Sequence, residues 1–180
     1  MKYKYNDIIK SLPKTKNTKS SWWVKLWVRQ LSFPFTYIFI NIGFTSNMVS
    51  LLSIVIALIA FVLFSLSQPW MIISGIILIN FWLVLDCVDG NIARCNGRKT
   101  YYGEFIDAMS GYFVVGFVYF SLSITAYNIG GIVFDNSNVN ILILGSIASI
   151  SDILSRLIYR NYMSVTVSDS ASSGRQGNSK

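Results

Sequence analysis

Four long apolar segments dominate the chain after its first 45 residues. They cover residues 47–66, 70–85, 108–127 and 141–159. A membrane-spanning helix needs roughly 20 predominantly apolar residues, and these segments reach or approach that length. We therefore predict an all-α, polytopic membrane bundle of about four transmembrane helices. Ser46 or Asn47 is placed to cap the first helix, and Pro69 closes it.

A shorter amphipathic pattern at residues 20–31 precedes these segments. One helical face is apolar and another is basic, with Trp23, Leu26 and Trp27 set against Lys25 and Arg29. This pattern predicts a helix that lies in the lipid headgroup layer, although a soluble amphipathic cap has the same periodicity. We expect Pro34 to break the pattern, and residues 35–44 are too short to span the membrane.

Composition supports the membrane assignment. Of the 180 residues, 53% are hydrophobic and 13% are charged, with a mean hydropathy of +0.51, whereas a soluble domain carries about 25% charged residues. A soluble fold and global disorder are both excluded. The chain has no histidine, which rules out histidine-dependent catalysis and histidine-ligated metals, and Cys87 and Cys95 are too few for a disulfide scaffold.

The distribution of Lys and Arg predicts the orientation and the domain limits. Basic residues gather in the N-terminal segment, in the 94–99 loop and in the 156–180 tail, while segments 67–69 and 130–140 have none. Under the positive-inside rule both termini face the cytoplasm. We divide the chain into a basic segment (1–19), an interfacial helix with the approach to the first span (20–45), a transmembrane domain (46–163) and a disordered tail (164–180).

Three acidic residues form the candidate chemistry. Asp86 and Asp89 are three residues apart, so both carboxylates project from one helical face, and Asp107 begins the next helix. An antiparallel helix pair would bring the three together at the cytoplasmic mouth of the membrane. Acids at such a boundary need a partner, and a hard divalent cation such as Mg²⁺ suits carboxylate oxygens and substrate phosphates.

The residues around the acids suit a diphosphate. Arg94, with Arg98 and Lys99, supplies positive charge, and Gly90 and Gly103 leave room for the close approach of a substrate or a facing helix. The alternative is a solvated helix end whose acids pair with nearby basic residues.

This motif resembles the signature of the CDP-alcohol phosphatidyltransferases, DxxDGxxARx8GxxxDxxxD. The matching residues are Asp86, Asp89, Gly90, Ala93, Arg94, Gly103 and Asp107. Weaker similarity at residues 29–34 and 45–50 extends the resemblance over about residues 23–111. The remainder resembles the family only in its hydropathy.

The resemblance implies a phospholipid-synthesising enzyme that transfers a phosphatidyl or substituted phosphoryl group from a CDP-linked donor, commonly CDP-diacylglycerol, to an alcohol, with release of CMP. It implies two divalent metals, Mg²⁺ or Mn²⁺, bound by Asp86, Asp89 and Asp107, and a nucleotide site shaped by Gly90, Ala93, Arg94 and Gly103. We expect an integral protein of a bacterial inner (cytoplasmic) membrane with its site facing the cytoplasm. Its expected partners are the lipid donor, the acceptor, membrane lipids and a second copy in a homodimer, with no nucleic acid.

One position departs from the signature. The family has a fourth aspartate, a metal ligand and presumed general base, where this chain has Gly111. Asp152 or Glu104 is a candidate replacement, and an already acidic acceptor would need no base. Asp152 also lies one turn before Arg156, so a simple ion pair between the two is the stronger expectation.

Three other interpretations stay open. Gly111 permits a degenerate family member that binds metal and nucleotide without turnover. A prenyltransferase also uses carboxylates and Mg²⁺, but the motif after Asp89 argues against it, and charges gathered at one membrane face argue against a channel. The family usually has six spans, whereas this sequence offers four.

Overall fold

The computed structural model describes residues 3–11, 22–97, 101–134 and 139–176, with the side chains of the last two ranges described only to residues 130 and 166. Arg98, Lys99 and most of the basic N-terminal segment lie outside these ranges. The elements are α1 (Tyr5–Lys10), the π-helical turn η1 (Val24–Val28), α3 (Arg29–Ile42), α4 (Ser46–Ser65), α5 (Pro69–Cys95), α6 (Tyr101–Phe134) and α7 (Asn140–Gln176). The described part of the chain contains no strand.

Four of these helices are long and apolar enough to cross a membrane. The candidate spans are Ser46–Ser65, Pro69–Cys95, Tyr101–Gly130 and Asn140–Thr166. The prediction of an all-α membrane protein with four transmembrane helices and an N-terminal helix before them is confirmed.

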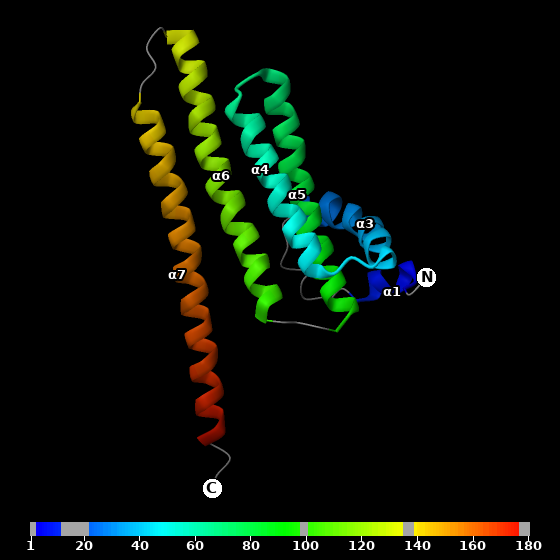
Figure 1. Ribbon diagram of the computed structural model, residues 1–180. Coiled ribbons are helices and arrows are strands. Elements are labelled where there is room, and N and C mark those ends of the chain that lie inside the picture. The colour runs from blue at the N-terminus through cyan, green and yellow to red at the C-terminus, as the bar shows by residue number, and fades with distance from the viewer. Residues whose placement is uncertain (1–2, 12–21, 98–100, 135–138, 177–180) are drawn as a thin grey trace.

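The helices form a layered bundle. Figure 1 shows α4 beside both α5 and α6, with α7 on the far side of α6. The shorter α3 lies at a steep angle to the spans and packs on α5, and α1 packs on α3 (Figure 1). The N-terminal helices therefore cover the end of α5 that carries the aspartate motif.

The helix α3 differs from its prediction at Pro34. This proline lies inside the helix, which continues to Ile42. Proline removes one backbone hydrogen bond, here the one to the carbonyl of Gln30, but the neighbouring carbonyls of Arg29 and Ser32 accept hydroxyl hydrogen bonds from Ser32 and Thr36, both at 2.7 Å. Side chains thus supplement the backbone ladder around the proline.

The turn between α3 and α4 is short and well defined. Gly43 has φ +101°, a left-handed conformation that favours glycine, and ends α3. Thr45 caps α4, since its hydroxyl accepts from the N–H of Met48 at 3.4 Å. The expected cap at Ser46 or Asn47 is wrong by one or two residues, because Ser46 and Asn47 already have their backbone within the helix.

Two helices continue beyond their apolar segments. The apolar segment of the second span ends at residue 85, and α5 continues through the acidic stretch to Cys95, so the whole motif at residues 86–94 is helical, as the spacing of Asp86 and Asp89 predicts. Residues 164–176 continue α7 instead of forming the predicted disordered tail. Helix propagation adds one hydrogen bond per residue once a helix exists, and the described segment contains no proline to stop it.

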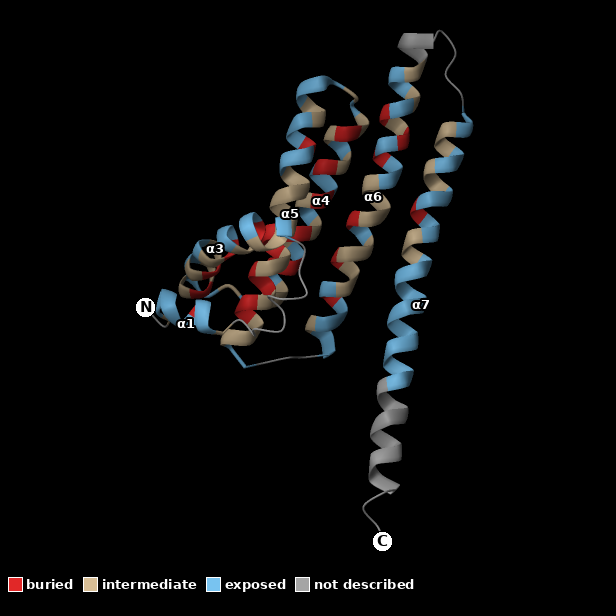
Figure 2. Cartoon of the chain, turned by 180° about the vertical axis from the view of Figure 1, so that it is seen from behind, coloured by how far each residue is buried: buried red, intermediate tan, exposed pale blue. Residues whose placement is uncertain are grey.

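Burial is concentrated at one end of the molecule. Eight fully or nearly buried apolar residues from α1, η1, α3, α4 and α5 form the main core: Ile8, Val28, Ile40, Val49, Val84, Leu85, Val88 and Ile92. Figure 2 shows α7, by contrast, with mostly exposed residues, and only 6% of its most apolar window is buried. The motif on α5 therefore lies within the main core.

Candidate functional site

Asp89 is held in place by the start of α4. Its side chain is only 4% exposed, and its Oδ2 accepts a hydrogen bond from the Ser50 hydroxyl at 2.6 Å. The Ser46 hydroxyl donates to the Asp89 backbone carbonyl at 3.1 Å. Asp86 lies one helical turn earlier and is half-buried. Two hydroxyls of one helix thus orient the better-buried member of the carboxylate pair.

Asp107 lies in the first turns of α6 and is exposed. The charges of Asp86 and Asp107 both act on Asp89, so the three carboxylates share one electrostatic neighbourhood. Even so, no three acidic or cysteine side chains among the described residues form a group that could hold a metal ion. Figure 1 shows α5 and α6 running in opposite directions, and α4 packs against both helices.

A buried polar chain joins the three helices near Asp107. The indole N–H of Trp82 on α5 donates to the Ser110 hydroxyl on α6 at 3.0 Å, and the hydroxyls of Ser110 and Ser53 are 2.7 Å apart. Ser53 donates to the backbone carbonyl of Ser50 at 2.6 Å, so Ser110 is left to donate to Ser53. This chain fixes the rotation of α6 one turn after Asp107.

Gly111 directly follows this polar chain. A Cβ built at Gly111 has no atom within 4 Å, so a larger side chain has room there. The position that carries the fourth aspartate in the family's signature therefore opens onto free space rather than onto a packed neighbour.

Gly90 and Arg94 lie together one turn apart on α5. A Cβ at Gly90 would lie 3.4 Å from Nη1 of Arg94, so the guanidinium lies beside the glycine backbone. Nη2 of Arg94 donates to Oδ1 of the buried Asn91. Ala93 and Gly103, the other two residues expected to shape the nucleotide site, are both half-buried.

The expected ion pair on α7 is confirmed. Nε of Arg156 lies 3.0 Å from Oδ2 of Asp152. Ser149 donates to the carbonyl of Gly116, and Arg160 to the carbonyl of Glu104, each at 3.3 Å. These two contacts set the antiparallel register of α6 and α7 and place Asp152 level with about residue 112, close in height to Gly111. Glu104 itself is exposed.

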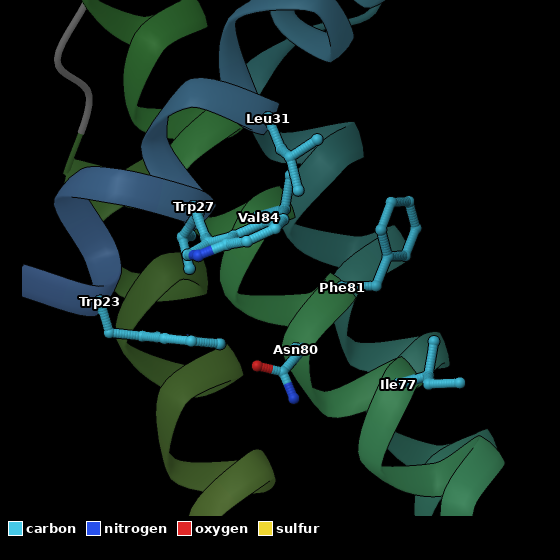
Figure 3. A pocket seen from close by; sticks show the side chains of 8 residues that line it. Trp23, Trp27, Leu31, Ile77, Asn80, Phe81 and Val84 are labelled. Atoms are coloured by element: carbon cyan, nitrogen blue, oxygen red, sulfur yellow. The ribbon is translucent and has the colours of Figure 1, made fainter.

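A groove of about 270 Å³ lies between η1 and α5. Figure 3 shows Trp23 and Trp27 on one side and Ile77 and Phe81 on the other, with Val84 next to Trp27 in this view. Asn80 is its polar member, and the Asn80 amide donates to the carbonyl of Ile76 at 2.9 Å. The groove ends at Val84. Asp86 comes two residues later, on the opposite face of α5, because residues two apart on a helix do not share a face.

Sequence reasoning missed the polar side chains that orient the motif: Ser32, Thr36, Ser46, Ser50, Ser53, Trp82, Asn91 and Ser110. One signal was present. Ser32 and Thr36 are spaced i, i+4 in α3, and Ser46, Ser50 and Ser53 recur at helical spacing in α4. Small hydroxyl residues that repeat on one face of an apolar helix indicate helix contacts.

These features define a helical membrane protein with a buried carboxylate at the end of one span and further acids on the next. The chain matches the family model for CDP-alcohol phosphatidyltransferase over residues 44–171, which includes all four spans. It therefore belongs to this family, whose members are generally transferases. A search of curated protein sequences finds no match. The matched region begins after α3, so it does not include the interfacial helix.

Members of the family generally use a divalent metal. The donor chemistry of the site fits such an ion, because carboxylate oxygens are the ligands that Mg²⁺ and Mn²⁺ prefer. Ser50 supplies the kind of outer hydrogen bond that orients a ligating carboxylate. The described residues offer the donors on two helices, α5 and α6, without a ready-made group of three.

Proposed function

We propose that this chain is a membrane transferase that moves a phosphatidyl or substituted phosphoryl group from a CDP-linked donor to an alcohol, with release of CMP. The observation that carries the proposal is the arrangement at the end of α5. Asp89 is oriented by Ser50, and Arg94 lies beside Gly90 one turn further on. A carboxylate and a guanidinium fixed at neighbouring turns suit a metal-bound diphosphate.

Asp86, Asp89 and Asp107 would hold the divalent metal. A bound metal supplies charge neutralisation on the diphosphate and on the leaving CMP. Arg94 would bind the diphosphate, while Gly90 keeps the helix surface low enough for the nucleotide to approach. Asp107, Asp152 and Glu104 stay candidates for the acceptor side, with Asp152 occupied by its ion pair with Arg156.

The groove between η1 and α5 supports a lipid-linked donor such as CDP-diacylglycerol. Its walls are apolar apart from Asn80, which suits an acyl chain. Two exposed tryptophans, Trp23 and Trp27, cover the groove from the side of η1, as expected for a helix at the membrane–water boundary.

The charge distribution supports a cytoplasmic location for the site. Arg94 lies in the last turn of α5, and Arg98 and Lys99 follow it in the sequence, whereas the turn between α4 and α5 has no Lys or Arg. On this basis the protein is a phospholipid-synthesising enzyme of a bacterial inner membrane, with the start of α6 and the end of α5 at the cytoplasmic face.

Gly111 favours a second candidate function. Without an acid at this position the chain would bind metal and a CDP-linked lipid but not turn over. Removal of a general base typically lowers a rate by about 10²–10⁴-fold, so a slow enzyme and an inactive binding protein predict different amounts of CMP.

The test measures CMP release by the full chain in lipid nanodiscs with CDP-diacylglycerol, Mg²⁺ or Mn²⁺ and a panel of alcohols. We expect metal-dependent release, raised about 10²–10⁴-fold by Gly111→Asp. The matched control is Gly130→Asp, because a Cβ at Gly130 also meets nothing within 4 Å on the same helix. Release by Gly111→Asp alone would support the binding protein, and no release by either form would contradict the proposed reaction.

A further inference from the structure

Asn91 is a buried polar side chain inside the motif, only 1% exposed. A buried amide is costly unless its groups are hydrogen-bonded. The Asn91 Nδ2 donates to the hydroxyls of Ser32 at 3.2 Å and Thr36 at 3.0 Å, both on α3. Its Oδ1 accepts from Nη2 of Arg94. One side chain thus joins the interfacial helix to the cation of the proposed diphosphate site.

The two hydroxyls determine which way the amide faces. Ser32 donates its proton to the carbonyl of Arg29, and Thr36 donates to the carbonyl of Ser32, each at 2.7 Å. A hydroxyl has a single proton to donate, so both offer only lone pairs to Asn91. The amide NH₂ must therefore face α3, and its oxygen is left to face the guanidinium.

This orientation limits where Arg94 can place its charge. One guanidinium nitrogen is tied to Asn91, and Nη1 lies beside Gly90. The Nε of Arg94 is buried without a hydrogen-bond partner among the described residues. Arginine carries five N–H donors, so the guanidinium keeps donors that an anion could use.

We propose that Asn91 is a positioning residue that sets the guanidinium of Arg94 for a nucleotide diphosphate and couples it to α3 through Ser32 and Thr36. The inference rests on the proposed function in that Arg94 binds the diphosphate. Because α3 continues from η1, whose Trp23 and Trp27 are exposed, the docking of the interfacial helix also determines nucleotide affinity. None of these three polar residues belongs to the family signature.

The test makes two measurements on the full chain in nanodiscs. Calorimetry gives the affinity for CDP in the presence of Mg²⁺. Electron paramagnetic resonance gives the affinity for Mn²⁺ in the absence of nucleotide. We expect Asn91→Leu to weaken CDP binding by about tenfold or more, since hydrogen bonds to charged groups are among the strongest. Mn²⁺ affinity should stay within about twofold, because Asp89 keeps its bond to Ser50.

A pair of substitutions on α3 separates positioning from folding. Thr36→Val removes the acceptor for Asn91 but keeps the volume, and we expect about a threefold to tenfold loss of CDP affinity. Thr36→Ser keeps the hydroxyl and should bind CDP as the unaltered chain does. This pair of variants tests whether Asn91 positions Arg94 even if Asn91→Leu fails to fold.

Two outcomes contradict different statements. Unchanged CDP affinity in folded Asn91→Leu or in Thr36→Val would overturn the role of Asn91 alone. Absence of CDP binding to the unaltered chain would overturn the proposed function and, with it, this role. Equal weakening by Thr36→Val and Thr36→Ser would show a packing effect and also overturn the inference.

Discussion

The two halves of the bundle are held together in different ways. Around the motif, α3, α4 and α5 are joined by buried hydrogen bonds between side chains, as in the contacts of Ser50 with Asp89 and of Thr36 with Asn91. In the C-terminal half, α6 and α7 meet through small residues. A Cβ at Gly145 would overlap the Cβ of Ser123, so the two backbones pass very close together.

This difference shows that fixing the direction of a side chain and bringing two helices close together are separate effects. Hydrogen bonds from two directions determine where the side chains of Asp89 and Arg94 lie, as an active site requires. Small-residue packing brings helices close without setting the direction of a particular side chain, and Glu104 on α6 is exposed. We therefore expect activity to depend most strongly on the first half and stability to respond in both.

The largest effect is expected at Asp89. Asp89→Asn removes a charged ligand from the proposed metal site, and we expect CMP release to fall by about a thousandfold, since a metal supplies several kcal/mol. The control is Asp7→Asn, an exposed acid of α1. A rate within tenfold of the unaltered chain would contradict the assignment of Asp89.

A smaller loss is expected at Ser50, which orients Asp89. Ser50→Ala should lower CMP release or metal affinity by about 10–100-fold, as for other partners of metal ligands. Ser65→Ala is the matched control, because its hydroxyl lies on the same helix and bonds only the local carbonyl of Phe61 at 2.9 Å. Equal rates for the two variants would show that Ser50 does not act through Asp89.

Stability should respond at the contact between α6 and α7. Gly145→Leu forces a side chain against Ser123, and overpacking of this kind costs about 1–3 kcal/mol. We expect a lower thermal midpoint in detergent, while Gly130→Leu at an open position changes it little. Equal midpoints would indicate that α7 does not rest on α6 as described.

The smallest effect is expected at Asp152. Its ion pair with Arg156 is partly exposed, with relative side-chain exposures of 53% for Arg156 and 33% for Asp152, and exposed pairs contribute about 0–1 kcal/mol. We expect Asp152→Asn to change the rate of CMP release by less than about twofold. A loss beyond tenfold would instead identify Asp152 as the substitute base for position 111.

Prediction succeeded where the information is local and failed where it is not. The number of spans follows from apolar length, and the i, i+4 pairing of Asp152 and Arg156 follows from helical spacing. The rotation of α6 could not be predicted, because it depends on hydrogen bonds of Ser110 with Trp82 of α5 and Ser53 of α4, and the periodicity of a single helix carries no information on such contacts. The effect of Pro34 was likewise decided by hydroxyls that supplement the backbone around it.

The sequence by itself determined the class of protein, the four spans and the family, because apolar length and motif spacing are properties of short stretches of chain. Only the tertiary structure decided which side chains orient the motif. Asn91 lies 55 and 59 residues from Thr36 and Ser32 in the chain, and Ser50 lies 39 residues from Asp89. Contacts at such separations exist only after the helices pack, since burial is what obliges each polar group to find a partner.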